Sequence, residues 1–149
     1  VAKDKAKLVK EMRASEGSTG PFQTYYEVIA FAAALGIQRK AFHPFSEAEA
    51  SKEIDPIRQE QFASKGYDQL IGLVSVIHNK NPKVLGNDEV SERNKVEIFE
   101  GYANGGLGVL SDMLRGSENY GIQILLLLSS LRKNNNKNIN DDILELDFL

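Results

Sequence analysis

The two histidines, His43 and His78, are the side chains in this sequence best suited to bind a metal or to move protons near neutral pH. The chain has no cysteine, and neither histidine belongs to a pair at the helical spacing that histidine-based zinc sites usually show. A serine in a G-x-S-x-G turn, which would suit a hydrolase nucleophile, is also missing from the sequence. We therefore interpret both histidines as structural or surface residues, and we expect no metal, no cofactor and no catalytic residue.

Carboxylates are the second group that could do chemistry. Most of them fall on the polar faces of expected helices, where a pair such as Glu89 and Arg93 supports the helix at i,i+4 spacing. Two carboxylates could still converge in the folded chain and act as an acid and base pair. We expect a non-enzymatic protein, with an enzyme whose site assembles only in three dimensions as an alternative.

The segment GYANGGLG, residues 101–108, has the glycine content of a loop that binds phosphate. Backbone N–H groups at the start of a helix at Leu107 would suit an anion. However, the Lys-Ser/Thr pair of a P-loop does not follow, and no clear strand precedes the segment. We favour a helix break at residues 104–106, in which glycines permit tight packing and positive φ.

Basic residues gather toward the N-terminus, although the whole chain carries a formal net charge of −3. Residues 139–149, by contrast, carry acids only. This asymmetry suggests that the N-terminal part could meet an anionic partner such as duplex DNA. The candidate DNA-binding residues are Lys3, Lys5, Lys10, Arg13, Arg39 and Lys40. The alternative is an ordinary solvated face, because so small a local excess of positive charge is weak evidence for nucleic-acid binding.

Hydrophobic periodicity and helix signals predict an all-α fold, a compact multi-helix single domain that would position these groups. Helices are expected at residues 3–14, 24–36, 55–66, 67–78, 88–104 and 107–114, and from Ser117 onward. A strand is the alternative for residues 67–78, because short apolar runs fit either structure. Thr24 with Glu27 forms a capping box, Asp88 suits a helix start, and Asp55-Pro56 suits another.

The expected domain organisation is a helical domain over residues 1–132, followed by a polar, Asn-rich linker and an acidic tail over residues 133–149. Apolar residues at helical spacing predict the core of this domain. They are Leu8, Met12, Val28, Phe31, Leu35, Leu70, Val74, Ile77, Phe99, Leu110, Ile124 and Leu127.

Two features of the sequence suggest where in the cell the protein is located. Its longest strictly apolar run, Ile124 to Leu128, falls far short of the roughly 20 residues that a membrane-spanning helix needs. The absence of cysteine fits a reducing compartment. We expect a soluble, cytoplasmic protein without a membrane partner.

Three stretches together carry a family resemblance: FAAALG at residues 31–36, EIDPIR at residues 53–58 and YANGGL at residues 102–107. This pattern resembles the bacterial DNA phosphorothioation-associated protein 4 family, also called Dnd system-associated protein 4, over roughly Val1 to Leu131. The resemblance implies an accessory protein of a Dnd modification and restriction system, a defence system, with other proteins of that system as partners. It implies no reaction, so no catalytic residue is carried over.

A second resemblance concerns residues 1–36, which are similar to a ribbon-helix-helix module. In that fold a strand before the first helix pairs with its twin in a homodimer and reads DNA. Here the short strand would lie at or before Val1. We therefore expect a non-enzymatic accessory component that acts through protein or DNA contacts, with a ribbon-helix-helix-like DNA-binding regulator as the alternative and a homo-oligomer as an option.

Overall fold

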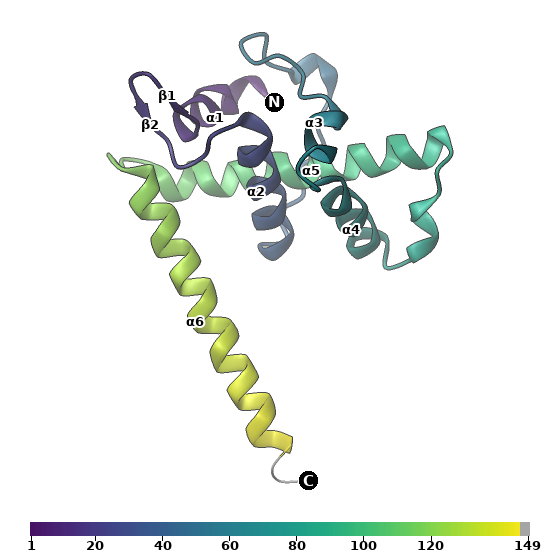
Figure 1. The fold of residues 1–149 in the computed structure, drawn as a ribbon, viewed down its shortest axis with the longest axis vertical. Helices are drawn as coiled ribbons and strands as arrows, with labels where there is room; N and C mark the ends of the chain where they lie inside the picture. The colour runs from purple at the N-terminus through teal and green to yellow at the C-terminus, as the bar shows by residue number, and fades with distance from the viewer. Residues whose placement is uncertain (147–149) are drawn as a thin grey trace.

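The fold is all-α, as the sequence predicts, with one small β-hairpin near the N-terminus (Figure 1). The computed structural model describes residues 1–146, and for Ser18 and residues 138–146 it describes the backbone alone. The elements, in chain order, are η1 (Lys3–Lys5), α1 (Ala6–Met12), β1 (Ala14–Ser15), β2 (Ser18–Thr19), α2 (Tyr25–Gln38), η2 (Glu47–Glu49), α3 (Gln59–Ala63), α4 (Asp68–Asn79), η3 (Pro82–Leu85), α5 (Glu89–Leu114) and α6 (Tyr120–Leu146).

Helices α2 and α5 cross at the centre of the molecule (Figure 1). Their backbones approach so closely that only glycine fits at the crossing. A Cβ atom at Gly106 would lie 1.8 Å from the carbonyl oxygen of Ala32, and one at Gly36 would lie 2.1 Å from that of Tyr102. The expected helix break at residues 104–106 is therefore wrong, because α5 runs unbroken through the glycines and uses them for packing.

The N-terminal residues form a unit that packs on the start of α2. Helix α1 is followed by the two-stranded hairpin, and the Ala14 N–H donates to the Phe22 carbonyl at 2.6 Å. Both strands of the described chain thus follow α1, whereas a ribbon-helix-helix module needs a strand before its first helix. Instead, Ala2 forms a β-bridge with Ala50 of the same chain.

Several helix-start signals in the sequence correspond to helix caps in the structure. At the start of α2 the Glu27 N–H donates to Thr24 Oγ1 at 3.3 Å, and the Thr24 N–H donates to Glu27 Oε2 at 3.0 Å, which confirms the capping box. Asp88 caps α5, and residues 68–79 are helical rather than a strand. The helix start expected at Asp55-Pro56 is wrong, since α3 begins only at Gln59.

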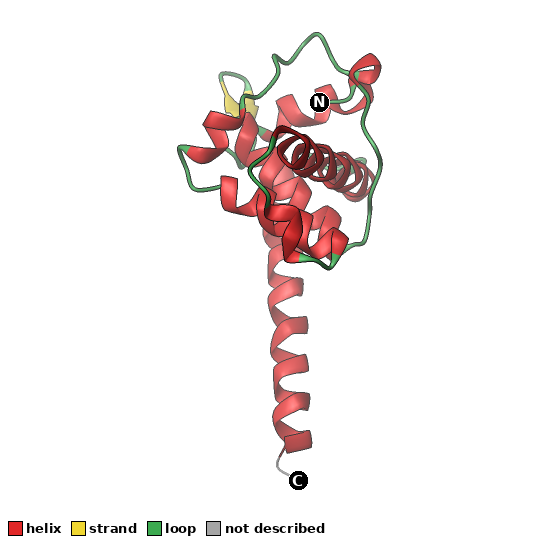
Figure 2. Ribbon diagram, turned by 90° about the vertical axis from the view of Figure 1, so that its right-hand side faces the viewer, coloured by secondary structure: helices red, strands yellow, loops and turns green. Residues whose placement is uncertain are grey.

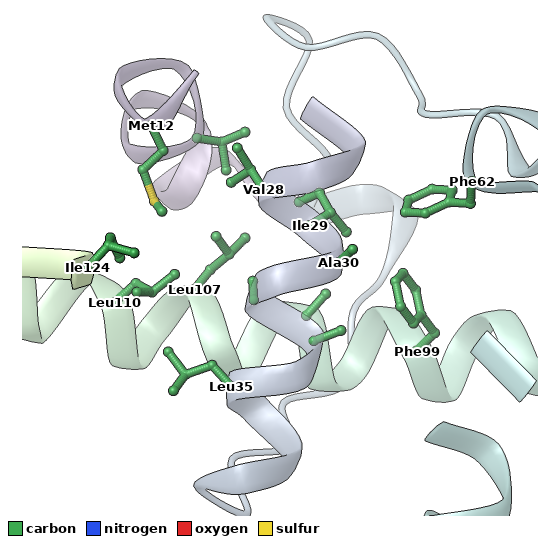
Figure 3. Close-up of a cluster of buried hydrophobic side chains, with 14 of the residues drawn as sticks. Met12, Val28, Ile29, Ala30, Leu35, Phe62, Phe99, Leu107, Leu110 and Ile124 are labelled. Atoms are coloured by element: carbon green, nitrogen blue, oxygen red, sulfur yellow. The ribbon is translucent and has the colours of Figure 1, made fainter. Parts of the chain in front are cut away.

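The core lies between α1, α2, α4 and α5 and reaches the start of α6 (Figure 3). Eight of the predicted core residues are buried: Met12, Val28, Leu35, Val74, Phe99, Leu110, Ile124 and Leu127. Three others are partly buried against this cluster: Leu8, Phe31 and Leu70. The prediction for Ile77 is wrong, because 44% of this residue is exposed.

Helix α6 extends away from the rest of the molecule (Figures 1 and 2). At 1.5 Å per residue, it is about 40 Å long. Only its first turns pack on the core, through buried Ile124 and Leu127 and partly buried Leu131. The helix continues through the Asn-rich segment to Leu146, where the sequence suggests a linker. The domain boundary at residue 132 stays a prediction.

Candidate functional site

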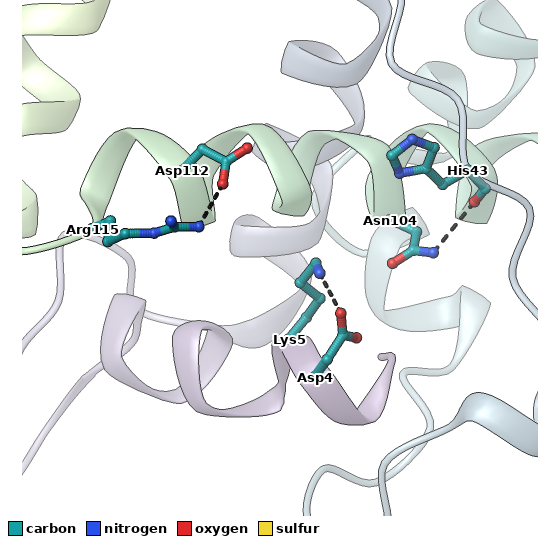
Figure 4. Close-up of polar contacts among 6 residues, drawn as sticks. All are labelled: Asp4, Lys5, His43, Asn104, Asp112 and Arg115. Atoms are coloured by element: carbon teal, nitrogen blue, oxygen red, sulfur yellow. Dashed lines mark hydrogen bonds and ion pairs between the residues drawn. The ribbon is translucent and has the colours of Figure 1, made fainter.

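Both histidines make local contacts with α5. The backbone N–H of His43 donates to the Gly101 carbonyl at 3.0 Å, and its carbonyl accepts from Asn104 Nδ2 at 3.4 Å (Figure 4). His78 Nδ1 lies 3.1 Å from the Tyr102 hydroxyl. Among the side chains that the structure describes, no group of three or more histidines, aspartates or glutamates is placed to hold a metal ion.

The phosphate-loop alternative for the glycine cluster is wrong in this structure. Gly105 and Gly106 are buried in the middle of α5, so no helix begins at Leu107 and no free N–H groups point outward there. Gly105 faces the backbone of the segment after α2, because a Cβ there would lie 2.0 Å from the Ala41 carbonyl oxygen. The glycines of this cluster therefore allow the backbone of α2 and of the segment after it to pack closely against α5.

The six candidate DNA-binding residues separate into two groups. Lys3, Lys5, Lys10 and Arg13 lie on or beside η1 and α1, whereas Arg39 and Lys40 follow the C-terminal end of α2. The start of α2, not its end, lies beside α1 (Figure 3). The structure therefore does not bring all six together.

The first of these groups is largely engaged within the chain. Lys5 pairs with Asp4 (Figure 4), and Lys10 Nζ lies 2.6 Å from Glu53 Oε2. The guanidinium of Arg13 lies 4.3 Å from the ring centroid of Tyr25. The two carboxylates offset the positive charges of Lys5 and Lys10, whereas the Tyr25 ring holds Arg13 without removing its charge. The DNA-binding role of the six residues stays a prediction.

A cavity of about 430 Å³ lies between α2, α5 and residues 45–59. Two of its lining residues, Glu47 and Glu100, are acidic, and neither histidine lines it. The pKa of Glu100 is raised, first by loss of water around its carboxyl, while the Val1 amino group lowers it and Glu97 and Glu47 raise it further. The same cavity lowers the pKa of the Val1 amino group through burial.

Several large apolar side chains are exposed on α6. Its exposed fractions are 54% at Ile122, 65% at Leu125 and 59% at Leu126. Residues at i, i+3 and i+4 share one face of a helix, so these three lie together. On a helix of 3.6 residues per turn, this face is opposite to the one that Ile124 and Leu127 bury. Helix α6 therefore presents an apolar face outward at the point where it leaves the core, which we call the α6 apolar face (Ile122, Leu125 and Leu126).

Comparison with known families decides the relationship of this chain. The family model described as DNA sulphur modification system-associated protein 4 matches residues 1–146. The chain belongs to this family. The match confirms the resemblance expected from the sequence motifs, and it extends beyond Leu131 to include all of α6. Neither a curated protein sequence nor a solved structure shows significant similarity to the chain.

In this member of the Dnd-associated family, sequence reasoning missed the α6 apolar face. The signal was present, because the run ILLLL at residues 124–128 exceeds what one face of a helix can hold. Where a helix is apolar on all sides, more than one of its faces needs covering. The rest of this chain covers only the face that carries Ile124 and Leu127. Across residues 1–146, every helix is too short or too polar to span a lipid bilayer.

Proposed function

We propose that this family member is a non-enzymatic accessory component of a bacterial DNA phosphorothioation-linked modification and restriction system. It acts by binding another protein of that system along α6. The family match supports the association with the system. The observation that carries the proposed mode of action is the α6 apolar face, with Ile122, Leu125 and Leu126 each more than half exposed.

The energetics of α6 favour a bound partner. A helix in water draws most of its stability from packing of an amphipathic face rather than from intrinsic propensity. The C-terminal part of α6 stands apart from the other elements in both views (Figures 1 and 2). A partner helix laid along α6 would bury the α6 apolar face and support the rest of the helix, in the manner of helix-in-groove recognition.

Co-expression of the chain with the other proteins of its system, followed by affinity capture, tests this proposal. The informative variant is Leu125→Glu/Leu126→Glu, because glutamate and leucine both favour helices and these positions do not contact the core. We expect the wild-type chain to capture a partner and this variant to lose it while keeping its helical circular dichroism.

A matched control places the same two charges on another exposed apolar pair. Leu73 and Ile77 lie one turn apart on α4 and are 55% and 44% exposed. We expect Leu73→Glu/Ile77→Glu to capture the partner as the wild type does. Loss of capture in the α4 variant, with the α6 variant unaffected, would contradict the proposed surface.

A further inference from the structure

The cavity between α2, α5 and residues 45–59 has the size and lining of a small-molecule site. Its volume of about 430 Å³ lies within the usual range of ligand pockets. The walls are mainly apolar side chains drawn from separate parts of the chain. They include Ile29, Phe45, Ile54, Ile57, Phe62 and Phe99.

The wall formed by the connection between α2 and α3 is held in place. Residues 39–58 contain only the short η2, and a connection of this length in a compact domain is usually either functional or disordered. The Ser51 N–H donates to the Val1 carbonyl at 2.7 Å, and Lys10 pairs with Glu53 on the same connection. Ile54 is only 4% exposed, so the segment is anchored on the core and the cavity is already formed.

The charged side chains that line the cavity are both negative. Glu47 and Glu100 line it, no lysine or arginine does, and neither glutamate forms an ion pair with a side chain that the structure describes. The one positive group at the cavity is the Val1 amino group, which is itself partly buried beside Glu100. Loss of water raises the pKa of Glu100, and Glu97 and Glu47 add to the rise, which exceeds the opposite effect of the Val1 amino group. A positive group brought into the cavity would compensate these carboxylates.

We propose that this cavity binds a compact organic cation, whose apolar body packs against Phe62, Phe99 and Ile57 and whose protonated nitrogen meets Glu47 and Glu100. The aromatic rings suit such a ligand because they pack against its apolar body and attract positive charge at their faces. This site is separate from the α6 apolar face and does not depend on the proposed function.

The test uses a matched pair of probes, 2-phenylethylammonium and its neutral analogue 2-phenylethanol, titrated into the full chain. Binding is followed by NMR shifts of the methyl groups of Ile29, Ile54 and Ile57. We expect a dissociation constant on the order of 1 mM for the cation, as suits so small a ligand. The neutral analogue should bind about tenfold more weakly, because it lacks the charged contact.

Two variants and one control complete the design. Glu47→Gln/Glu100→Gln should bring the affinity for the cation close to that for the alcohol, and Ile57→Trp should block both probes by filling the cavity. Glu118→Gln, an exposed change outside the cavity, should leave binding unchanged. Equal affinity for the two probes, no methyl shifts up to about 10 mM, or full binding of the cation by a folded Glu47→Gln/Glu100→Gln chain would overturn the proposal.

Discussion

Gly106 on α5 faces the carbonyl oxygen of Ala32 on α2 so closely that a Cβ atom would lie 1.8 Å from it. No contact between side chains could bring two helices this near, so the crossing that organises the core depends on the absence of a side chain at Gly106. A glycine inside a helix lowers its intrinsic stability by roughly 1 kcal/mol relative to alanine. The packing at this crossing offsets that cost.

Gly106→Ala should therefore destabilise the protein by about 3 kcal/mol, because overpacking outweighs the gain in helix propensity. Gly108→Ala is the matched control on the same helix. Its Cβ would meet nothing nearer than His43 Nδ1 at 3.9 Å, so we expect it to stabilise by about 0.5–1 kcal/mol. Urea unfolding measures both, and equal stability of the two variants would contradict the close crossing.

Tyr120 attaches the start of α6 to α1, because its hydroxyl donates to Glu11 Oε2 at 2.8 Å. This bond favours the neutral phenol and raises the pKa of Tyr120. Tyr120→Phe should lower the free energy of unfolding by about 1 kcal/mol. It should also speed amide exchange in the first turns of α6.

The control for this change is Tyr67→Phe. The Tyr67 side chain packs near Tyr26, and its hydroxyl makes no hydrogen bond to a group that the structure describes, so removal of the hydroxyl should change stability by less than about 0.5 kcal/mol. Similar losses for the two variants would show that Tyr120 contributes through its ring alone.

Glu100 should make stability depend on pH in a defined direction. Loss of water raises its pKa above the ordinary value of 4.5, so the folded protein disfavours the ionised carboxylate. This penalty is absent below the unfolded pKa and develops as the pH rises through the unfolded and then the folded value. Glu100→Gln should therefore be more stable than the wild type at pH 7, with the difference shrinking toward zero near pH 4.

Thermal unfolding of both chains at the two pH values checks this prediction. Glu118→Gln, at an exposed position after α5, provides the comparison for the loss of one acidic side chain. A Glu100→Gln chain that is less stable than the wild type at pH 7, or equally altered at both pH values, would contradict it.

The sequence predicted the elements whose signals are local. The capping box of Thr24 with Glu27 and the cap at Asp88 depend on residues within one turn, so the starts of α2 and α5 could be placed. The outcome at Gly106 could not be predicted in this way, because it depends on Ala32, which lies far earlier in the chain. Whether these glycines break a helix or pack it is decided by the partner helix.

The candidate sites show the same division between local and distant information. Lys10 looked free in the sequence, but Glu53 neutralises it across the fold. The run ILLLL does not show by itself which leucines are buried, and Leu125 and Leu126 are exposed because only one side of α6 meets the rest of the chain. The cavity has no sequence motif, since its walls are drawn from Val1 to Leu107.

Duplex DNA should bind this chain weakly. Of the six candidate residues, Lys3, Arg39 and Lys40 make no ion pair or ring contact with a side chain that the structure describes. Each phosphate contact adds about 0.9 to the slope of log affinity against log salt, so we expect a slope no steeper than about −3. Fluorescence anisotropy with labelled duplexes, with and without phosphorothioate linkages, measures it. A slope of about −4 or steeper would show that the residues around α1 also reach phosphates.

The role of α6 in partner binding is tested by the affinity of the chain for the partner captured from its own system, compared between the wild type and Leu125→Glu/Leu126→Glu. Isothermal titration calorimetry gives both dissociation constants. Because each leucine would sit at the centre of the buried interface, we predict that the variant binds at least about 100-fold more weakly while its unfolding midpoint is unchanged. An unchanged dissociation constant in the folded variant would contradict the central claim that α6 binds the partner.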